Sequence, residues 1–87
     1  MPGISRVGVD VAGGKITGNL APTVLVNGAP IAVKGADVAG HGTGLHAGPT
    51  MVGASATVFA NGIAVCRAGD AATCGDTASG SGNVSAG

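Results

Sequence analysis

The sequence predicts a small all-β domain of short strands and hairpins in three pseudo-repeats, and three observations support this prediction. The pattern Thr-Val-x-x-Asn-Gly occurs at residues 23–28 and again at 57–62. Glycine accounts for 18 of the 87 residues, and its even spread leaves no room for a helix because each helix-interior glycine costs about 1 kcal/mol. Valine, isoleucine and leucine recur periodically between the glycines, which argues against a disordered low-complexity chain.

Each copy of the repeated pattern is expected to form a β-hairpin. In the first copy, the side chains of residues 23–27 alternate between the two faces of a strand. Asn27-Gly28 is a strong signal for a two-residue hairpin turn because both residue types tolerate positive φ. Residues 29–33 are the natural return strand. The second copy predicts the same arrangement over residues 57–66, with its turn at Asn61-Gly62.

A fainter pattern extends the repeat to three units of roughly thirty residues each. Residues 6–14 align with residues 33–41, and residues 67–74 match both when one residue is dropped between the Gly and the Asp. The end of the chain, residues 83–87, resembles a truncated copy of the repeated strand. Each unit then consists of a Gly-x-Asp turn, a Gly-rich crossing and a short strand. Three such units predict approximate three-fold symmetry, which would suit a position on the axis of a true trimer.

Length and composition predict that residues 1–87 form a single domain whose core needs additional support. A chain of this size buries only about two-thirds of its unfolded surface, and Phe59 is its sole aromatic residue. We expect Phe59 to lie in the core as the only large ring available there. A structural metal, oligomerisation or docking onto a larger partner would supply the remaining stability.

The charge pattern excludes several classes of partner. Four basic and four acidic side chains balance to a net charge of zero, so the chain has no basic face for nucleic acid and no polybasic anchor for anionic lipid. No apolar run is long enough to span a membrane, and the first residues lack the pattern of a signal peptide. We therefore expect a protein made in the cytoplasm, with Cys66 and Cys74 reduced. A disulfide between them is the alternative if the protein ends up outside the cell.

Two histidines and two cysteines are the predicted metal ligands. His41 and His46 have an H-x₄-H spacing, and the glycines between them let both imidazoles converge. Cys74 occupies nearly the same place in the third unit that His41 occupies in the second. Cys66 is available as a fourth ligand, although its alignment with Ala32 favours a small buried side chain. The fourth position is therefore open to Cys66, to water or to a residue of a partner, with zinc as the expected metal and iron as the alternative.

Signatures of catalysis are missing from the sequence. The chain contains no Glu to act as a base, no G-x-S-x-G motif and no P-loop. Its four Asp residues are expected mainly to accept hydrogen bonds from backbone N–H groups in turns. We expect neither an enzyme nor a small-molecule substrate.

The sequence resembles the PAAR-repeat proteins, which are small metal-stabilised tips of contractile injection machines. The resemblance rests on the opening Arg6-Val7-Gly8, the two Thr-Val-x-x-Asn-Gly strands, the Gly-x-Asp turns and the three-unit layout, and it covers almost the whole chain. The Pro-Ala-Ala-Arg stretch that gives the family its name is kept in part, as Pro30-Ile31-Ala32-Val33 and Ala64-Val65-Cys66-Arg67.

This resemblance implies a cone-shaped fold with zinc near its apex, typically held by three His and one Cys. His41, His46 and Cys74 fit that ligand pattern, and Gly14 stands where a further His is expected. The implied function is that of a non-enzymatic tip that caps a trimeric β-helical spike, one copy per trimer. Such a tip is assembled on a phage tail or a type VI secretion tube, is delivered to the target cell envelope and helps to pierce it, touching the membrane only transiently. The alternative is a zinc-binding adaptor that tethers an effector or another protein.

Overall fold

The computed structural model describes residues 2–86, and within them the all-β class is confirmed. The strands are two residues long and form three separate antiparallel sheets, and the helical element among these residues is a single 3-10 turn. In chain order the elements are β1 (Val11–Ala12), β2 (Gly14–Lys15), β3 (Leu25–Val26), β4 (Ala29–Pro30), η1 (Gly44–His46), β5 (Phe59–Ala60) and β6 (Ile63–Ala64). No helix in this range is long and apolar enough to cross a membrane.

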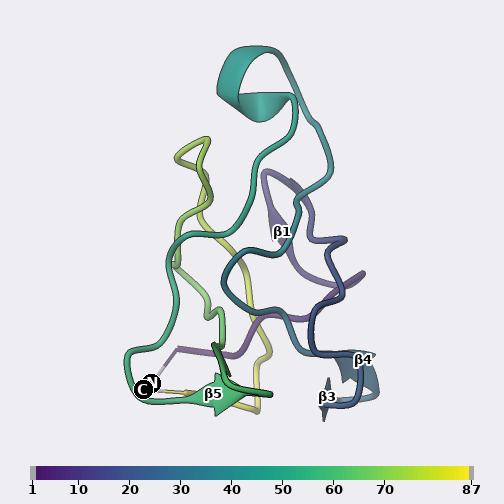
Figure 1. Ribbon diagram of the computed structural model, residues 1–87, viewed down its shortest axis with the longest axis vertical. Coiled ribbons are helices and arrows are strands. Elements are labelled where there is room, and N and C mark those ends of the chain that lie inside the picture. The colour runs from purple at the N-terminus through teal and green to yellow at the C-terminus, as the bar shows by residue number, and fades with distance from the viewer. Residues whose placement is uncertain (1, 87) are drawn as a thin grey trace.

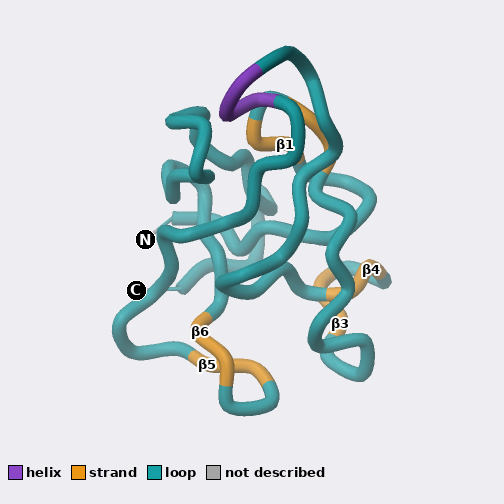
Figure 2. Tube along the Cα trace, turned by 45° about the horizontal axis from the view of Figure 1, so that its top comes forward, coloured by secondary structure: helices purple, strands orange, loops and turns teal. Residues whose placement is uncertain are grey.

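The molecule is elongated, with extents of 32 × 23 × 22 Å, and it narrows toward one end (Figure 1). The η1 turn occupies the narrow end, which we call the apex. The strands β3 and β5 lie at the opposite end, which we call the base, together with the first and last described residues (Figure 1). Figure 2 shows that most of the chain between the hairpins is irregular loop. The fold therefore depends on hydrogen bonds between loops more than on extended sheets.

The two predicted hairpins form with the predicted turns. Asn27 and Gly28 have φ of 52° and 84°, and Asn61 and Gly62 have φ of 50° and 80°. Two consecutive residues at positive φ are the requirement of a type I′ turn, whose twist matches that of the strands it joins. As a result, β3 pairs with β4 and β5 pairs with β6 in the same register.

The two ends of the chain form a third hairpin-like pair at the base. A bridge joins Gly3 to Ser85, the Ile4 amide donates to the Val84 carbonyl at 2.8 Å, and the Ala86 amide donates to the Pro2 carbonyl at 3.0 Å. Residues 83–86 thus take the place that the predicted truncated strand requires, while Gly87 lies outside the described residues. The third unit is completed by joining the last residues to the first.

A closed cycle of backbone hydrogen bonds relates the three units. The Ser5 amide donates to the Cys66 carbonyl at 3.0 Å, the Cys66 amide to the Ala32 carbonyl at 2.9 Å, and the Ala32 amide to the Ser5 carbonyl at 3.0 Å. All three residues are fully buried. Each unit therefore makes the same contact to the next one, and the predicted pseudo-three-fold layout is confirmed.

A second set of equivalent bonds corrects the alignment of the units by one residue. The amides of Ile16, Met51 and Ala78 donate to the carbonyls of Asp10, Ala36 and Asp70, at 3.1, 2.9 and 2.8 Å. The sequence comparison had matched Asp10 with Asp37, but the structural equivalent of Asp10 is Ala36. The first unit carries an extra residue, Val9, in its turn, and this insertion shifts the sequence alignment of the two units by one residue after Gly8.

Two clusters of buried aliphatic side chains form the core, and Phe59 belongs to neither. The cluster nearer the apex includes Ile16, Val38 and Met51, whereas the one nearer the base includes Ile31, Val33 and Val65. Phe59 is 58 % exposed, so the expectation of a buried ring was wrong. Alternation along β5 explains this outcome, because Ala60 faces the core and Phe59 must then face away.

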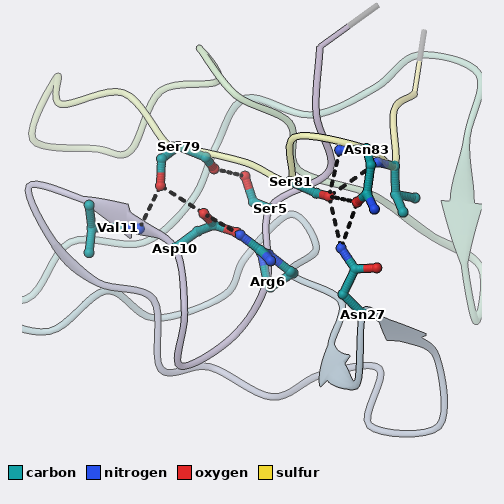
Figure 3. Close-up of polar contacts among 9 residues, drawn as sticks. Ser5, Arg6, Asp10, Val11, Asn27, Ser79, Ser81 and Asn83 are labelled. Atoms are coloured by element: carbon teal, nitrogen blue, oxygen red, sulfur yellow. Dashed lines mark hydrogen bonds and ion pairs between the residues drawn. The ribbon is translucent and has the colours of Figure 1, made fainter.

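Polar side chains fasten the C-terminal segment onto the N-terminal one (Figure 3). The Ser5 hydroxyl donates to the Ser79 carbonyl at 2.6 Å, and the Ser79 hydroxyl donates to Asp10 Oδ1 at 2.9 Å. Asp10 also accepts from the Arg6 backbone amide at 2.9 Å and from Arg6 Nε at 2.7 Å. Burial alone would raise the pKa of the Asp10 carboxyl, but the hydrogen bonds from Arg6 and Ser79 outweigh it and lower this pKa.

Candidate metal centre

Two loops at the apical end bring four possible metal ligands together. The first loop, residues 38–49, carries His41 and His46, and the second, residues 73–76, carries Cys74 and Asp76. One ligand atom from each side chain can be chosen so that all four atoms lie within 4.8 Å of one another. The loops belong to the second and third units, so the cluster joins segments that are far apart in the sequence.

His41 Nε2 lies at the centre of the cluster. It is 2.8 Å from Asp76 Oδ2, 3.0 Å from His46 Nδ1 and 3.8 Å from Cys74 Sγ. Asp76 Oδ2 is in turn 3.6 Å from Cys74 Sγ and 3.5 Å from His46 Nδ1. Four-coordinate zinc with bonds of about 2.0–2.3 Å to N, O and S places its ligand atoms about 3.3–3.7 Å apart. Three of the five separations, 3.5, 3.6 and 3.8 Å, are close to those values, and the other two are shorter, at hydrogen-bond distance. With all four ligand atoms within 4.8 Å of one another, the four side chains could hold one ion.

The other nitrogen of His41 sets the orientation of its ring. His41 Nδ1 lies 3.1 Å from the Ala39 carbonyl oxygen, which can only accept, so Nδ1 carries a proton and Nε2 faces the cluster. Metal-binding histidines commonly donate their second N–H to a carbonyl in this way. The contacts with the Ala39 carbonyl and with Asp76 raise the pKa of His41 in the metal-free protein. The hydrogen bond with His41 lowers the pKa of Asp76.

The backbone of the first unit packs directly against the cluster. A side chain at Gly13 would collide with Asp76 Oδ2 and His41 Nε2, and one at Gly14 would collide with the Ala39 carbonyl oxygen. Gly13 also has φ of 81°, where residues with a Cβ are strained. The first unit thus contributes a closely packed glycine turn at the position where family resemblance suggested another His.

The structure does not bring Cys66 to this cluster. Its side chain is fully buried, and its thiol donates to the Gly53 carbonyl at 3.5 Å. Burial is the main cause that raises the pKa of the Cys66 thiol to about 12, and the nearby charge of Asp70 adds to it. Metals bind the thiolate, so this environment is unfavourable for ligation.

Sequence reasoning missed Asp76. It treated all four Asp residues as turn acceptors, and Asp10 and Asp70 do accept from the backbone amides of Arg6 and Arg67, at 2.9 and 2.7 Å. Asp76 instead points its carboxylate toward His41. The available signal was the spacing Cys74-x-Asp76, which places two possible ligands in one tight turn.

Comparison with protein families gives one clear finding. Residues 10–85 of the 87-residue chain match the family model described as the PAAR motif. No curated protein sequence matches the chain.

Proposed function

This chain belongs to the PAAR motif family, the spike-tip proteins of contractile injection systems, and from that premise we propose that it caps a trimeric β-helical spike, one copy per trimer. Its role in this proposal is mechanical and involves no catalysis. The tip is made in the cytoplasm, assembles at the end of a phage tail or a type VI secretion tube, and meets the target envelope first when the sheath contracts. Contact with the target membrane is transient.

The closed backbone cycle through Ser5, Ala32 and Cys66 is the observation that carries this proposal. A monomer can bind on the axis of a trimer with equal contacts to each subunit only when its own docking face repeats three times. The two hairpins and the paired chain ends supply three equivalent elements, and all of them lie at the base (Figure 1). Their strands are short and peripheral, which also suits continuation of the partner's sheets by strand addition.

We propose further that His41, His46, Cys74 and Asp76 hold one zinc ion, with iron as the alternative. The donor set of two imidazoles, a thiolate and a carboxylate suits zinc. When bound, the ion supplies a cross-link that stabilises the folded state. His41 and His46 then hold one apical loop and Cys74 and Asp76 hold the other, so the apex resists separation of the second unit from the third.

The stoichiometry of a purified complex tests the capping role. The chain is mixed with trimeric β-helical spike proteins from injection systems, and the product is analysed by size-exclusion chromatography with light scattering. The expected mass is that of one trimer plus one copy of this chain. Three copies per trimer, or binding only to a monomeric soluble protein, would contradict the capping role, and the second result would favour an adaptor.

A further inference from the structure

We infer that the base binds the end of its trimeric partner through the side chains of Leu25 and Phe59. Ser85 occupies the third equivalent position, where its small side chain does not make the corresponding apolar contact. This inference rests on the proposed function and assigns the docking contact to particular residues. The three residues occupy the same place in the three units, because Leu25 pairs with Pro30, Phe59 pairs with Ala64 and Ser85 pairs with Gly3.

Both side chains belong to the exposed large apolar residues of the protein. Leu25 and Phe59 are 57 % and 58 % exposed, although each is large and apolar. They lie in β3 and β5, which are both at the base in Figure 1. A single exposed leucine is common on the surface of a folded protein. Leu25 and Phe59, however, are large apolar side chains at equivalent positions of two units, which indicates a contact that follows the pseudo-symmetry.

The neighbouring residues continue the same three-fold pattern. Val24, Val58 and Val84 accept equivalent hydrogen bonds from Ile31, Val65 and Ile4, at 2.8, 3.1 and 2.8 Å. All three valines are only partly buried against the basal core cluster. A ring of partly exposed valines therefore accompanies the contact residues in every unit.

The base also lacks charged side chains. The segments that form it, residues 2–5, 22–31, 56–65 and 82–86, contain no Lys, Arg, Asp or Glu. All eight charged residues lie elsewhere, at Arg6, Asp10, Lys15, Lys34, Asp37, Arg67, Asp70 and Asp76. Depletion of charge is typical of the buried centre of a protein interface. Together, the lack of charge at the base and its three-fold pattern point to the end of a trimer as the partner that covers the base. Such a trimer end offers three equivalent apolar sockets.

Ser85 provides a substitution that is expected to strengthen binding. The residue is exposed, and it stands at the third position of the ring that otherwise holds Leu25 and Phe59. Because a symmetric partner offers the same socket three times, the socket that faces Ser85 has no large side chain to receive. Substitution of Ser85 by Leu is then expected to strengthen binding, an effect that loss of folding cannot imitate.

The experiment measures binding to the purified trimeric spike protein of the same injection system by calorimetry. Leu25→Ser and Phe59→Ser are each expected to weaken binding about tenfold or more, and Ser85→Leu to tighten it about threefold or more. Leu45→Ser is the matched control, because Leu45 is 68 % exposed in η1 at the other end of the molecule, and it is expected to bind like the unaltered chain. Melting temperatures confirm that each variant is folded.

The outcomes separate this inference from the proposed function. If the unaltered chain fails to bind any trimeric spike protein, the capping role is wrong. If it binds and both Leu25→Ser and Phe59→Ser bind equally well, the capping role stands and the assignment of the contact is overturned. Equal weakening by Leu45→Ser would overturn it too. Self-association of the chain alone that is lost in Phe59→Ser would make a second copy the occupant, and would likewise overturn it.

Discussion

The His41 ring contacts both apical loops, one through each of its two nitrogens. Nδ1 faces the Ala39 carbonyl of its own loop, and Nε2 faces Asp76 of the other loop at 2.8 Å. Without a metal, the proton-accepting neighbours on both sides favour the charged imidazolium, which explains the raised pKa of His41. A metal requires the neutral imidazole, so protons and metal compete for this residue.

Loss of one cysteine is expected to abolish metal binding, and loss of the other is not. Cys74→Ser removes a thiolate from the cluster, so the metal content by elemental analysis should fall to near zero and the melting temperature should drop sharply. Cys66→Ala is the matched control, because the second unit already carries Ala32 at the equivalent place in the central cycle. We expect the Cys66 variant to keep its metal. Full metal content in Cys74→Ser would contradict the ligand assignment.

A stability difference that depends on pH is expected at Asp10. The folded-state pKa of Asp10 is lowered, so the carboxylate stabilises the fold above its unfolded pKa of about 4, and this contribution is lost as the pH falls through the folded value. At pH 7, Asp10→Asn should cost about 1–3 kcal/mol through its buried hydrogen bonds. Thermal melts from pH 7 to about pH 3 should show the gap between the variant and the unaltered chain shrinking.

The exposed Asp37 provides the control for this experiment. No described residue donates a hydrogen bond to the Asp37 carboxylate, so Asp37→Asn should stay within about 0.5 kcal/mol of the unaltered chain at pH 7. A gap for Asp10→Asn that stays constant down to the lowest pH would show that the carboxylate charge of Asp10 does not stabilise the fold.

Among the elements, the hairpins were the most predictable from sequence. Asn-Gly pairs readily adopt the positive φ that a type I′ turn requires, so the turn position and the register followed directly from the residue types. The burial of Phe59 was not predictable in the same way, because alternation shows that neighbours face opposite sides but not which side is the core. Two-residue strands such as β5 give too short a pattern to decide the matter.

Strain at positive φ predicts different outcomes for two glycine substitutions in loops. Gly28 has φ of 84°, and a Cβ placed there would meet no atom within 4 Å. Gly28→Ala should therefore cost about 1–2 kcal/mol from backbone strain alone. Gly48 is equally open but has no positive φ, so Gly48→Ala should be within about 0.5 kcal/mol of the unaltered protein. Chemical denaturation measures both, and equal effects would refute the strain argument.

At the scale of the whole molecule, the pseudo-symmetry could be predicted from the repeats, but its exact alignment could not. The inserted Val9 shifted the comparison by one residue, and only hydrogen bonding shows that Ala36 and Asp10 are equivalent. The cluster of possible metal ligands was predictable in the same partial way. His41 and His46 share an H-x₄-H spacing and Cys74 falls near the place of His41 in the repeat. Asp76 has the residue type of a turn acceptor, and only its spacing from Cys74 sets it apart.

The pairing of the chain ends predicts that the protein tolerates circular permutation at a hairpin turn. Ala86 and Pro2 are hydrogen bonded in the way that Val26 and Ala29 are paired, so residue 87 joined directly to residue 1 gives a two-residue connection. With Asn and Gly placed at those two positions, and new ends opened between Asn61 and Gly62, the permuted chain should fold and keep its metal.

Melting temperature and metal content, compared with those of the unaltered chain, test the permutant. A control permutant opened between Ala32 and Val33 interrupts the central cycle and should be strongly destabilised. If both permutants melt alike, the cycle does not hold the units together.

The paired ends have one more consequence, for a tip that is driven forward. Because residues 2–5 pair with residues 82–86 at the base, the two described apical segments, residues 38–49 and 73–76, are both continuous bends of the chain. Neither of these two bends offers a chain end from which an obstacle could peel it backward. A dragging force then has to move a whole bend at once, against the contacts of His41 with Asp76 and Cys74 that join the two bends.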